Sequence, residues 1–163
     1  MDERKIRLLI VDDEVQFLDA MAERLVMRGL EVSKAASGAE ALELARTGRF
    51  DLALVDLKMP GIDGMQLLRI LKREHKFLEV IILTGHGALE SAVEATKLGA
   101  YGYLPKPYEI DKLLETLREA YETRMRRKHQ ADEDRMKQIE QIATGQSALG
   151  ILRALRKVDD GEK

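Results

Sequence analysis

Polar side chains follow four apolar runs of this chain, and their types fit the chemistry of a phosphoryl group. In chain order they are Asp12, Asp13, Asp56, Thr84 and Lys106. Short β-branched runs between helical stretches are typical of buried parallel strands. Ligands of open α/β sheets bind beyond the carboxyl ends of the strands, so we expect these side chains to meet at one edge. Carboxylates, a hydroxyl and an ammonium group in one crevice indicate a divalent cation beside a phosphoryl group.

Asp56 is the central candidate for a nucleophile, because carboxylates form aspartyl phosphate intermediates. With Asp12 and Asp13 it offers the hard oxygen ligands that Mg²⁺ prefers, and the cation would offset repulsion between a carboxylate and an incoming phosphoryl group. Lys106 could neutralise one phosphoryl oxygen as a point charge, and the Thr84 hydroxyl could donate to another. Phosphoryl transfer depends mostly on positioning and charge stabilisation, so these groups could suffice.

Each of these residues also has an ordinary structural explanation. A single acid at a strand end is more often a solvated turn residue, and Asp12 or Asp13 could simply cap the helix that follows. Thr84 could be a loop hydroxyl, and Lys106 alone would mean little. The joint pattern at the ends of four different strands is much harder to obtain by chance, so we favour a shared site.

Strand candidates alternate with helix candidates along the chain. We predict strands at residues 6–11, 30–36, 51–55, 80–83 and 101–105. We predict helices at about residues 14–28, 37–45, 65–74 and 88–98, and a longer one that begins near residue 109. The first helix carries Phe17, Met21 and Leu25 on one core-facing stripe, and Ser37 and Glu40 fit a capping box at the start of the second. This alternation predicts an α/β fold with a doubly wound, five-stranded parallel sheet that carries helices on both faces.

Residues 123–163 differ from the rest of the chain in composition. The heptad pattern of the last predicted helix is apolar at its a and d positions up to about residue 121, and then meets Arg124 and Arg127. A continuous coiled coil is therefore not predicted beyond this point. Apolar positions between residues 136 and 155 indicate one or two short amphipathic helices, with a break at residues 144–145.

Composition and charge limit the function classes. The formal net charge of -2 over 163 residues gives no general electrostatic case for nucleic acid, so we do not expect direct nucleic-acid binding. The basic cluster of residues 124–128 precedes acidic residues 132–134, which is typical of a solvated charged helix. The chain lacks cysteine, which excludes disulfides and thiolate metal sites. No apolar stretch approaches the roughly 20 residues of a membrane span, and no signal-peptide pattern is present, so we expect a cytoplasmic protein without a membrane partner.

Four segments of the chain resemble the receiver domain of bacterial two-component response regulators. LLIVDDE resembles the acidic-pair strand of that family, LALVDLKMPGIDG the phosphoacceptor strand and loop, VIILTGHG the strand of the switch threonine, and KLGAYGYLPKPY the last strand with its lysine and proline. The resemblance covers roughly residues 5–122. It implies a flavodoxin-like sheet of strand order 2-1-3-4-5, in a phosphoacceptor receiver domain of residues 1–122. The charged residues 123–163 would form a helical C-terminal extension.

The resemblance also implies roles for individual residues. Asp56 would accept a phosphoryl group from the phosphohistidine of a sensor histidine kinase or a histidine phosphotransfer protein. Asp13, Asp56 and the backbone carbonyl of Lys58 would bind Mg²⁺, and Asp12 would help through a water molecule. Lys58 and His86 would flank the path of the hydrolytic water.

The same resemblance implies a switch. Thr84 and Lys106 would hold the phosphoryl oxygens, and Thr84 would move toward the phosphate while the ring of Tyr103 turns inward behind it. The peptide bond between Lys106 and Pro107 matches one that is usually cis in the family. A cis bond is physically credible there, because X–Pro bonds lose only about 0.5–1 kcal/mol in this form.

We expect a phosphorylation-controlled switch rather than an enzyme that turns over a separate substrate. Self-phosphorylation and autodephosphorylation would be its only chemistry. The output would come from the face of about residues 88–121, which would control homodimerisation or docking to a protein partner. Residues 123–163 could mediate the same dimerisation or docking.

Other interpretations stay open beside this one. The chain could be a phosphorelay shuttle, or the receiver part of a larger DNA-binding transcriptional regulator. A phosphatase or phosphomutase with an aspartyl nucleophile is disfavoured, because dehalogenase-like members need an acid two residues after the nucleophile. Lys58 stands at that position after Asp56.

Overall fold

The computed structural model describes residues 4–85, 89–106, 108–145 and 148–160. Within these residues the chain forms five strands and six helices. It divides into two compact units, Met1–Arg124 and Met125–Lys163, which we describe separately. None of the described helices combines the length and the apolar character that crossing a bilayer requires.

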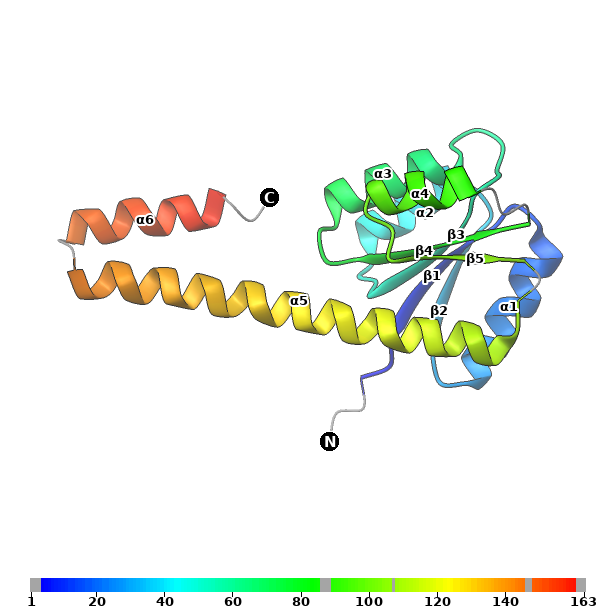
Figure 1. The fold of residues 1–163 in the computed structure, drawn as a ribbon, viewed down its shortest axis with the longest axis horizontal. Coiled ribbons are helices and arrows are strands. Elements are labelled where there is room, and N and C mark those ends of the chain that lie inside the picture. The colour runs from blue at the N-terminus through cyan, green and yellow to red at the C-terminus, as the bar shows by residue number, and fades with distance from the viewer. Residues whose placement is uncertain (1–3, 86–88, 107, 146–147, 161–163) are drawn as a thin grey trace. The chain divides into compact units, whose positions relative to one another are not determined.

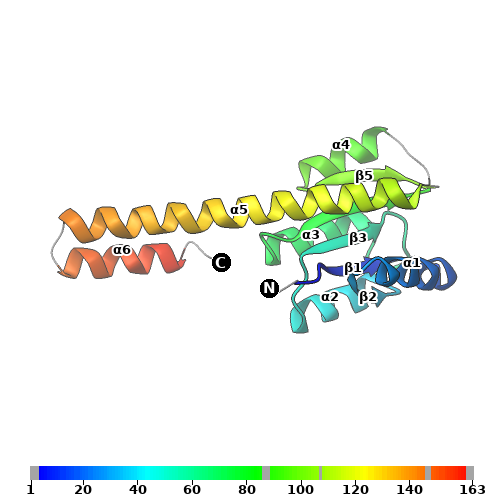
Figure 2. The same ribbon diagram turned by 90° about the horizontal axis from the view of Figure 1, so that it is seen from below.

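The first unit is built on a parallel sheet whose strands follow the order β2-β1-β3-β4-β5. The strands are β1 (Arg7–Val11), β2 (Glu31–Ala35), β3 (Leu52–Asp56), β4 (Glu79–Thr84) and β5 (Gly102–Pro105). In the register of the sheet, Val11 lies beside Ala35 and Val55, and Thr84 lies beside Pro105, so the carboxyl ends of the strands line up at one edge. Figure 2 shows β2 and β5 on opposite sides of the sheet. The predicted flavodoxin-like strand order is therefore confirmed.

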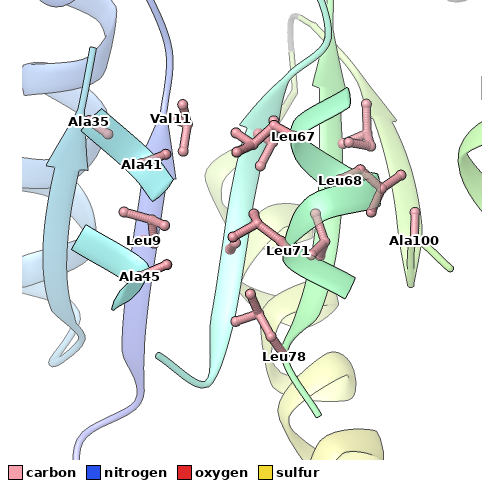
Figure 3. Packing of buried hydrophobic residues seen from close by; sticks show 14 of the residues in the cluster. Leu9, Val11, Ala35, Ala41, Ala45, Leu67, Leu68, Leu71, Leu78 and Ala100 are labelled. Atoms are coloured by element: carbon pink, nitrogen blue, oxygen red, sulfur yellow. The ribbon is translucent and has the colours of Figure 1, made fainter. Parts of the chain in front are cut away.

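Helices cover both faces of this sheet, as the alternation of strands and helices predicted. They are α1 (Val15–Met27), α2 (Gly38–Thr47), α3 (Gly64–Glu74), α4 (Leu89–Lys97) and the first part of α5 (Ile110–Gly145). The core on one face joins α2, α3 and α4, and the core on the other face joins α1 and α5 (Figure 1). Figure 3 shows Leu67, Leu68 and Leu71 of α3 packing in the first of these cores. Alternate residues of each strand point to opposite faces, so every central strand is buried on both sides.

Side-chain caps fix the start of two helices near the carboxyl edge of the sheet. Ser37 accepts a hydrogen bond from the backbone N–H of Glu40 at 3.1 Å, and the Glu40 carboxylate accepts one from the N–H of Ala36 at 2.8 Å. Only half of the capping box predicted there forms, because the Glu40 carboxylate accepts the N–H of Ala36 and not that of the N-cap residue Ser37. A full capping box that we did not predict joins Asp63 and Gln66 at the start of α3.

The second unit contains the end of α5 and the helix α6 (Ala148–Asp160). Helix α5 does not end where its apolar seam fails near residue 121, but runs on to Gly145. Polar pairs one helical turn apart support it, such as His129 with Glu133 at 3.1 Å and Gln130 with Asp134 at 3.0 Å. The end of α5 and α6 lie side by side in both overall views (Figures 1 and 2).

Candidate functional site

Three carboxylates meet where β1 and β3 end. One carboxylate oxygen from each of Asp12, Asp13 and Asp56 lies within 4.8 Å of the others. Asp12 and Asp56 are 1% and 7% exposed, whereas Asp13 is exposed to solvent. Neighbouring residues of a straight strand would point to opposite faces. The chain leaves β1 at Val11, so both acids of the pair can face the same crevice.

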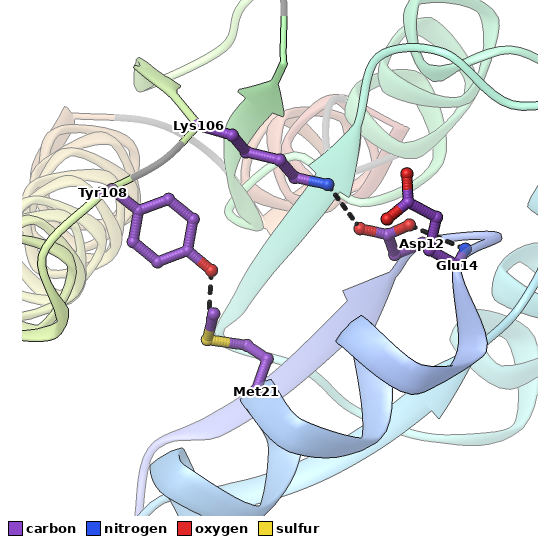
Figure 4. A network of polar contacts seen from close by, with 5 residues as sticks. All are labelled: Asp12, Glu14, Met21, Lys106 and Tyr108. Carbon is purple, nitrogen blue, oxygen red and sulfur yellow. Dashed lines mark hydrogen bonds and ion pairs between the residues drawn. The ribbon is translucent and has the colours of Figure 1, made fainter.

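Lys106 reaches this cluster from the end of β5. Its Nζ donates to Oδ2 of Asp12 at 2.8 Å, and the other oxygen of Asp12 accepts the backbone N–H of Glu14 at 2.9 Å (Figure 4). Asp12 therefore shapes the turn before α1 and also pairs with the lysine, but it does not cap the helix, whose N-cap residue is Glu14. The Asp12 side chain is 2% exposed and that of Lys106 is 16% exposed, so solvent screens this ion pair only weakly.

Burial raises the pKa of the Asp56 carboxyl to about 6. The charge of Lys106 and a hydrogen bond from the backbone of Lys58 act in the opposite direction, while the charges of Asp12 and Asp13 raise this pKa further. At neutral pH the group is mostly ionised, but the ionised form lies among like charges. A divalent cation among these oxygens would relieve that repulsion, so the donor set fits a hard cation such as Mg²⁺.

The loop that follows Asp56 is held close to the end of β3. The backbone N–H of Leu57 donates to the carbonyl of Leu83 at 3.0 Å, and that of Gly64 donates to the carbonyl of Leu57 at 3.0 Å. Gly64 approaches the strand so closely that a Cβ there would lie 2.7 Å from Cα of Leu57 and even closer to the carbonyl oxygen of Asp56. Glycine at position 64 therefore sets the geometry of the loop. Lys58 lies exposed within it.

Thr84 ends β4 between the strands that carry Asp56 and Lys106. The threonine is 1% exposed, and its backbone carbonyl accepts the N–H of Lys106 at 2.6 Å. Tyr103 of β5 is partly buried and packs against the core on the face of α2, α3 and α4. His86 and Pro107, to which the resemblance gave roles, lie outside the described residues.

Two aromatic residues near Lys106 were not among the residues predicted for the site. The Lys106 Nζ lies 4.1 Å from the ring centroid of Phe17, and the ring of Tyr108 meets that of Phe17 edge to face. Periodicity placed Phe17 only on the core-facing stripe of the first helix. Phe17 lies in the first turn of the helix that follows Asp12 and Asp13. This position near the acidic pair is the signal that could have suggested a role in the site.

Comparisons with known proteins agree with this geometry. The family model described as "Response regulator receiver domain" matches residues 8–118. The DNA-binding transcriptional regulator NtrC of Klebsiella pneumoniae is 42% identical over 102 residues, which cover 63% of this chain and 22% of that protein. The chain thus spans less than a quarter of the length of this relative.

Solved structures resemble the chain over most of the first unit. A response regulator receiver domain protein (CheY-like) from Methanospirillum hungatei superimposes with a TM-score of 0.73 and 33% identity, covering 76% of this chain and 99% of that one. The response regulator TrrA of Thermotoga maritima, solved in complex with Mg(2+)-BeF, gives a TM-score of 0.65 and 30% identity over 71% of this chain and 98% of that one.

Proposed function

The chain belongs to the response regulator receiver family, and on that premise we propose that Asp56 is its phosphoacceptor. The donor would be the phosphohistidine of a sensor histidine kinase or of a histidine phosphotransfer protein. One observation carries the proposal. A buried carboxylate at the end of β3 lies beside two further carboxylates, and the ammonium group of Lys106 is close enough to lower its pKa. This arrangement has an ionised oxygen to attack phosphorus and a positive charge to stabilise the group that arrives.

The proposed step transfers a phosphoryl group between two side chains. One oxygen of the Asp56 carboxylate attacks the phosphorus atom of phosphohistidine and forms a P–O bond. The P–N bond breaks, its electron pair stays on the imidazole, and the imidazole takes a proton from solvent. With acetyl phosphate as donor, the P–O bond to the acetyl group breaks and acetate leaves.

The donor set of the site favours Mg²⁺ as the cofactor. We propose that Asp13, Asp56 and the backbone carbonyl of Lys58 hold the cation, with Asp12 acting through water. When bound, Mg²⁺ neutralises charge on the carboxylate and on the phosphoryl oxygens. The printed description of the Thermotoga relative, a complex with Mg(2+)-BeF, supports this choice.

Two residues of this chain would hold the phosphoryl group after transfer. The Lys106 ammonium would pair with one phosphoryl oxygen, and the Thr84 hydroxyl would donate to another. Together with Tyr103, which lies beside Ile82 of β4 and packs against the core, they would form the switch. A phosphoryl group adds nearly two negative charges and three acceptor oxygens, enough to draw a nearby hydroxyl toward it.

The output would be a change in association rather than turnover of a separate substrate. We propose that the face of α4, β5 and the part of α5 up to Arg124 controls homodimerisation or the docking of a protein partner. The helices of the second unit would serve the same purpose, because Met136 and Leu152 are each 62% exposed there. Family membership supports a cytoplasmic location for the protein.

A second candidate is that this chain is the receiver part of a larger DNA-binding regulator. The Klebsiella relative, which is described as a DNA-binding transcriptional regulator, supports it. That description weighs against the expectation, drawn from net charge, that direct nucleic-acid binding is absent. A phosphorelay shuttle is also compatible with the site, because an aspartyl phosphate can pass its phosphoryl group to a histidine.

Incubation with Mg²⁺ and acetyl phosphate tests the proposal. Intact mass should show one added phosphoryl group on the wild-type chain and none on Asp56→Ala. Omission of Mg²⁺ should abolish the addition on the wild-type chain as well. Persistent labelling of Asp56→Ala would overturn the assignment of the phosphoacceptor.

A further inference from the structure

The ammonium group of Lys106 contacts two different kinds of partner. Its Nζ donates to Oδ2 of Asp12 at 2.8 Å and lies 4.1 Å from the ring centroid of Phe17. A cation within about 6 Å of an aromatic centroid is attracted by the negative face of the ring. This attraction uses none of the N–H donors of the lysine, so they stay available to carboxylate and phosphoryl oxygens.

The Phe17 ring is itself held by its neighbours. Tyr108 meets it edge to face, with ring centroids 6.3 Å apart and an angle of 84° between the planes. The Tyr108 hydroxyl donates to Sδ of Met21 at 3.3 Å, one turn further along α1 than Phe17 (Figure 4). Burial, with the nearby charge of Asp12, raises the pKa of the Tyr108 phenol, so it keeps the proton that it donates. The aromatic pair therefore joins α1 to the segment that carries the lysine.

We propose that Phe17 is a positioning residue for Lys106 in the phosphorylation reaction. The ring face limits where the long, flexible lysine side chain can place its charge, and directs it toward the Asp12 and Asp56 carboxylates. This inference rests on the proposed function of Asp56. It adds a residue of α1 that acts on the phosphoryl group through the lysine and without touching that group.

Beryllium fluoride binding measures this role on the full chain without turnover. Calorimetric titration in saturating Mg²⁺ would compare wild type, Phe17→Leu, Phe17→Tyr and Lys106→Met. We expect Phe17→Leu to weaken the affinity by about three- to tenfold, as loss of a partly desolvated cation–π contact predicts. Phe17→Tyr keeps an aromatic ring, so its affinity for beryllium fluoride should stay within about twofold of the wild-type value.

A double-mutant cycle separates positioning from simple core packing. In the Lys106→Met background, Phe17→Leu should cause no further loss of affinity, because the contact it removes no longer exists. Equal losses in both backgrounds would overturn the inference, since Phe17 would then act only through the core. No loss in the wild-type background would overturn it as well.

Two controls keep this result distinct from failure of the proposed function. Wild type that does not bind beryllium fluoride, or Asp56→Ala that binds it equally well, would overturn the phosphoacceptor assignment itself. Nuclear magnetic resonance gives a second measure that does not depend on the anion. The Lys106 Cε protons should be shifted upfield by the ring in wild type and Phe17→Tyr, and this shift should vanish in Phe17→Leu. Unshifted protons in wild type would overturn the inference.

Discussion

Gly64 packs directly against the backbone of Asp56. A Cβ at position 64 would press on the carbonyl oxygen of Asp56 and lie 2.7 Å from Cα of Leu57. The first residue of α3 thus fixes the end of β3, where the candidate nucleophile sits. The N–H of Gly64 adds a hydrogen bond to the carbonyl of Leu57 at 3.0 Å, so the loop closes back on the strand that begins it.

Gly64→Ala should damage both stability and phosphorylation. The contacts of the added methyl group are backbone atoms, which cannot rotate away, so we expect a loss of about 2 kcal/mol in the free energy of unfolding. The rate of phosphorylation by acetyl phosphate should fall several-fold, because Asp56 is displaced. Gly85→Ala is the matched control, since a Cβ at Gly85 would meet no atom of the described residues within 4 Å. Urea unfolding and intact mass measure both effects, and equal behaviour of the two variants would contradict this explanation.

The affinity of the site for Mg²⁺ should fall as the pH drops below about 6. The pKa of Asp56 is raised to about 6, chiefly by burial, so below that pH a proton occupies the carboxylate that the cation needs. Each further pH unit should then weaken binding by about tenfold. Calorimetric titrations between pH 5 and pH 7.5 would measure the effect.

Asp56→Asn is the control for this pH dependence. The amide cannot take up the proton, so the variant should bind Mg²⁺ more weakly at pH 7.5 but lose little further affinity between pH 6.5 and pH 5.5. If the Mg²⁺ affinity of Asp56→Asn depended on pH in the same way as that of wild type, a group other than Asp56 would be responsible for the pH dependence.

Asp51 at the opposite end of β3 should matter for stability and not for phosphorylation. It is 6% exposed, accepts the N–H of Arg7 at 2.9 Å, and lies 3.5 Å from the guanidinium of Arg124. Asp51→Ala would leave a partly buried N–H and a largely buried arginine without this partner, which should cost about 2–3 kcal/mol. Asp51→Asn keeps an acceptor and should cost less. At 20 °C both variants should be phosphorylated at the wild-type rate. A slower rate in a variant that is still fully folded would show that Asp51 affects the site at the other end of β3, which would contradict this prediction.

The exposed apolar side chains of the second unit should support self-association. Met136 and Leu152 are each 62% exposed, although they belong to the apolar sides of amphipathic helices. Met136→Glu and Leu152→Glu should weaken self-association by at least about tenfold, because a carboxylate resists burial in an interface. Phosphorylation of Asp56 should be unaffected. Sedimentation velocity before and after phosphorylation measures the effect. If both variants self-associate as strongly as wild type, the interface lies on the face of α4, β5 and α5 instead.

Much of the fold could be predicted from the sequence because buried parallel strands are continuously apolar. The run of residues 52–55 has no other plausible place than the middle of a sheet, and the polar residue that follows it must lie at the carboxyl edge. Because residues that follow parallel strands meet at the carboxyl edge of the sheet, the sequence alone predicted that Asp12, Asp13, Asp56 and Lys106 lie close together.

What could not be predicted depends on partners that are distant in sequence or on the backbone itself. The contact between Phe17 and Lys106 joins α1 to the end of β5, and periodicity alone gave the ring a core position. Asp51 had no visible partner because Arg124 lies far along the chain. A helical extension was predicted, but not that α5 itself continues unbroken to Gly145. The heptad pattern indicates only where a helix packs on a partner, whereas polar pairs along the helix can stabilise it without such packing.

Chemical trapping of the modified residue tests the central claim most directly. Borohydride reduces an acyl phosphate of aspartate to homoserine, so the phosphorylated chain can be reduced, digested and sequenced by mass spectrometry. We predict homoserine at position 56, only after treatment with both Mg²⁺ and a phosphoryl donor. Homoserine at position 12 or 13, or an unmodified peptide around residue 56 in a chain that carries the added phosphoryl mass, would contradict the account.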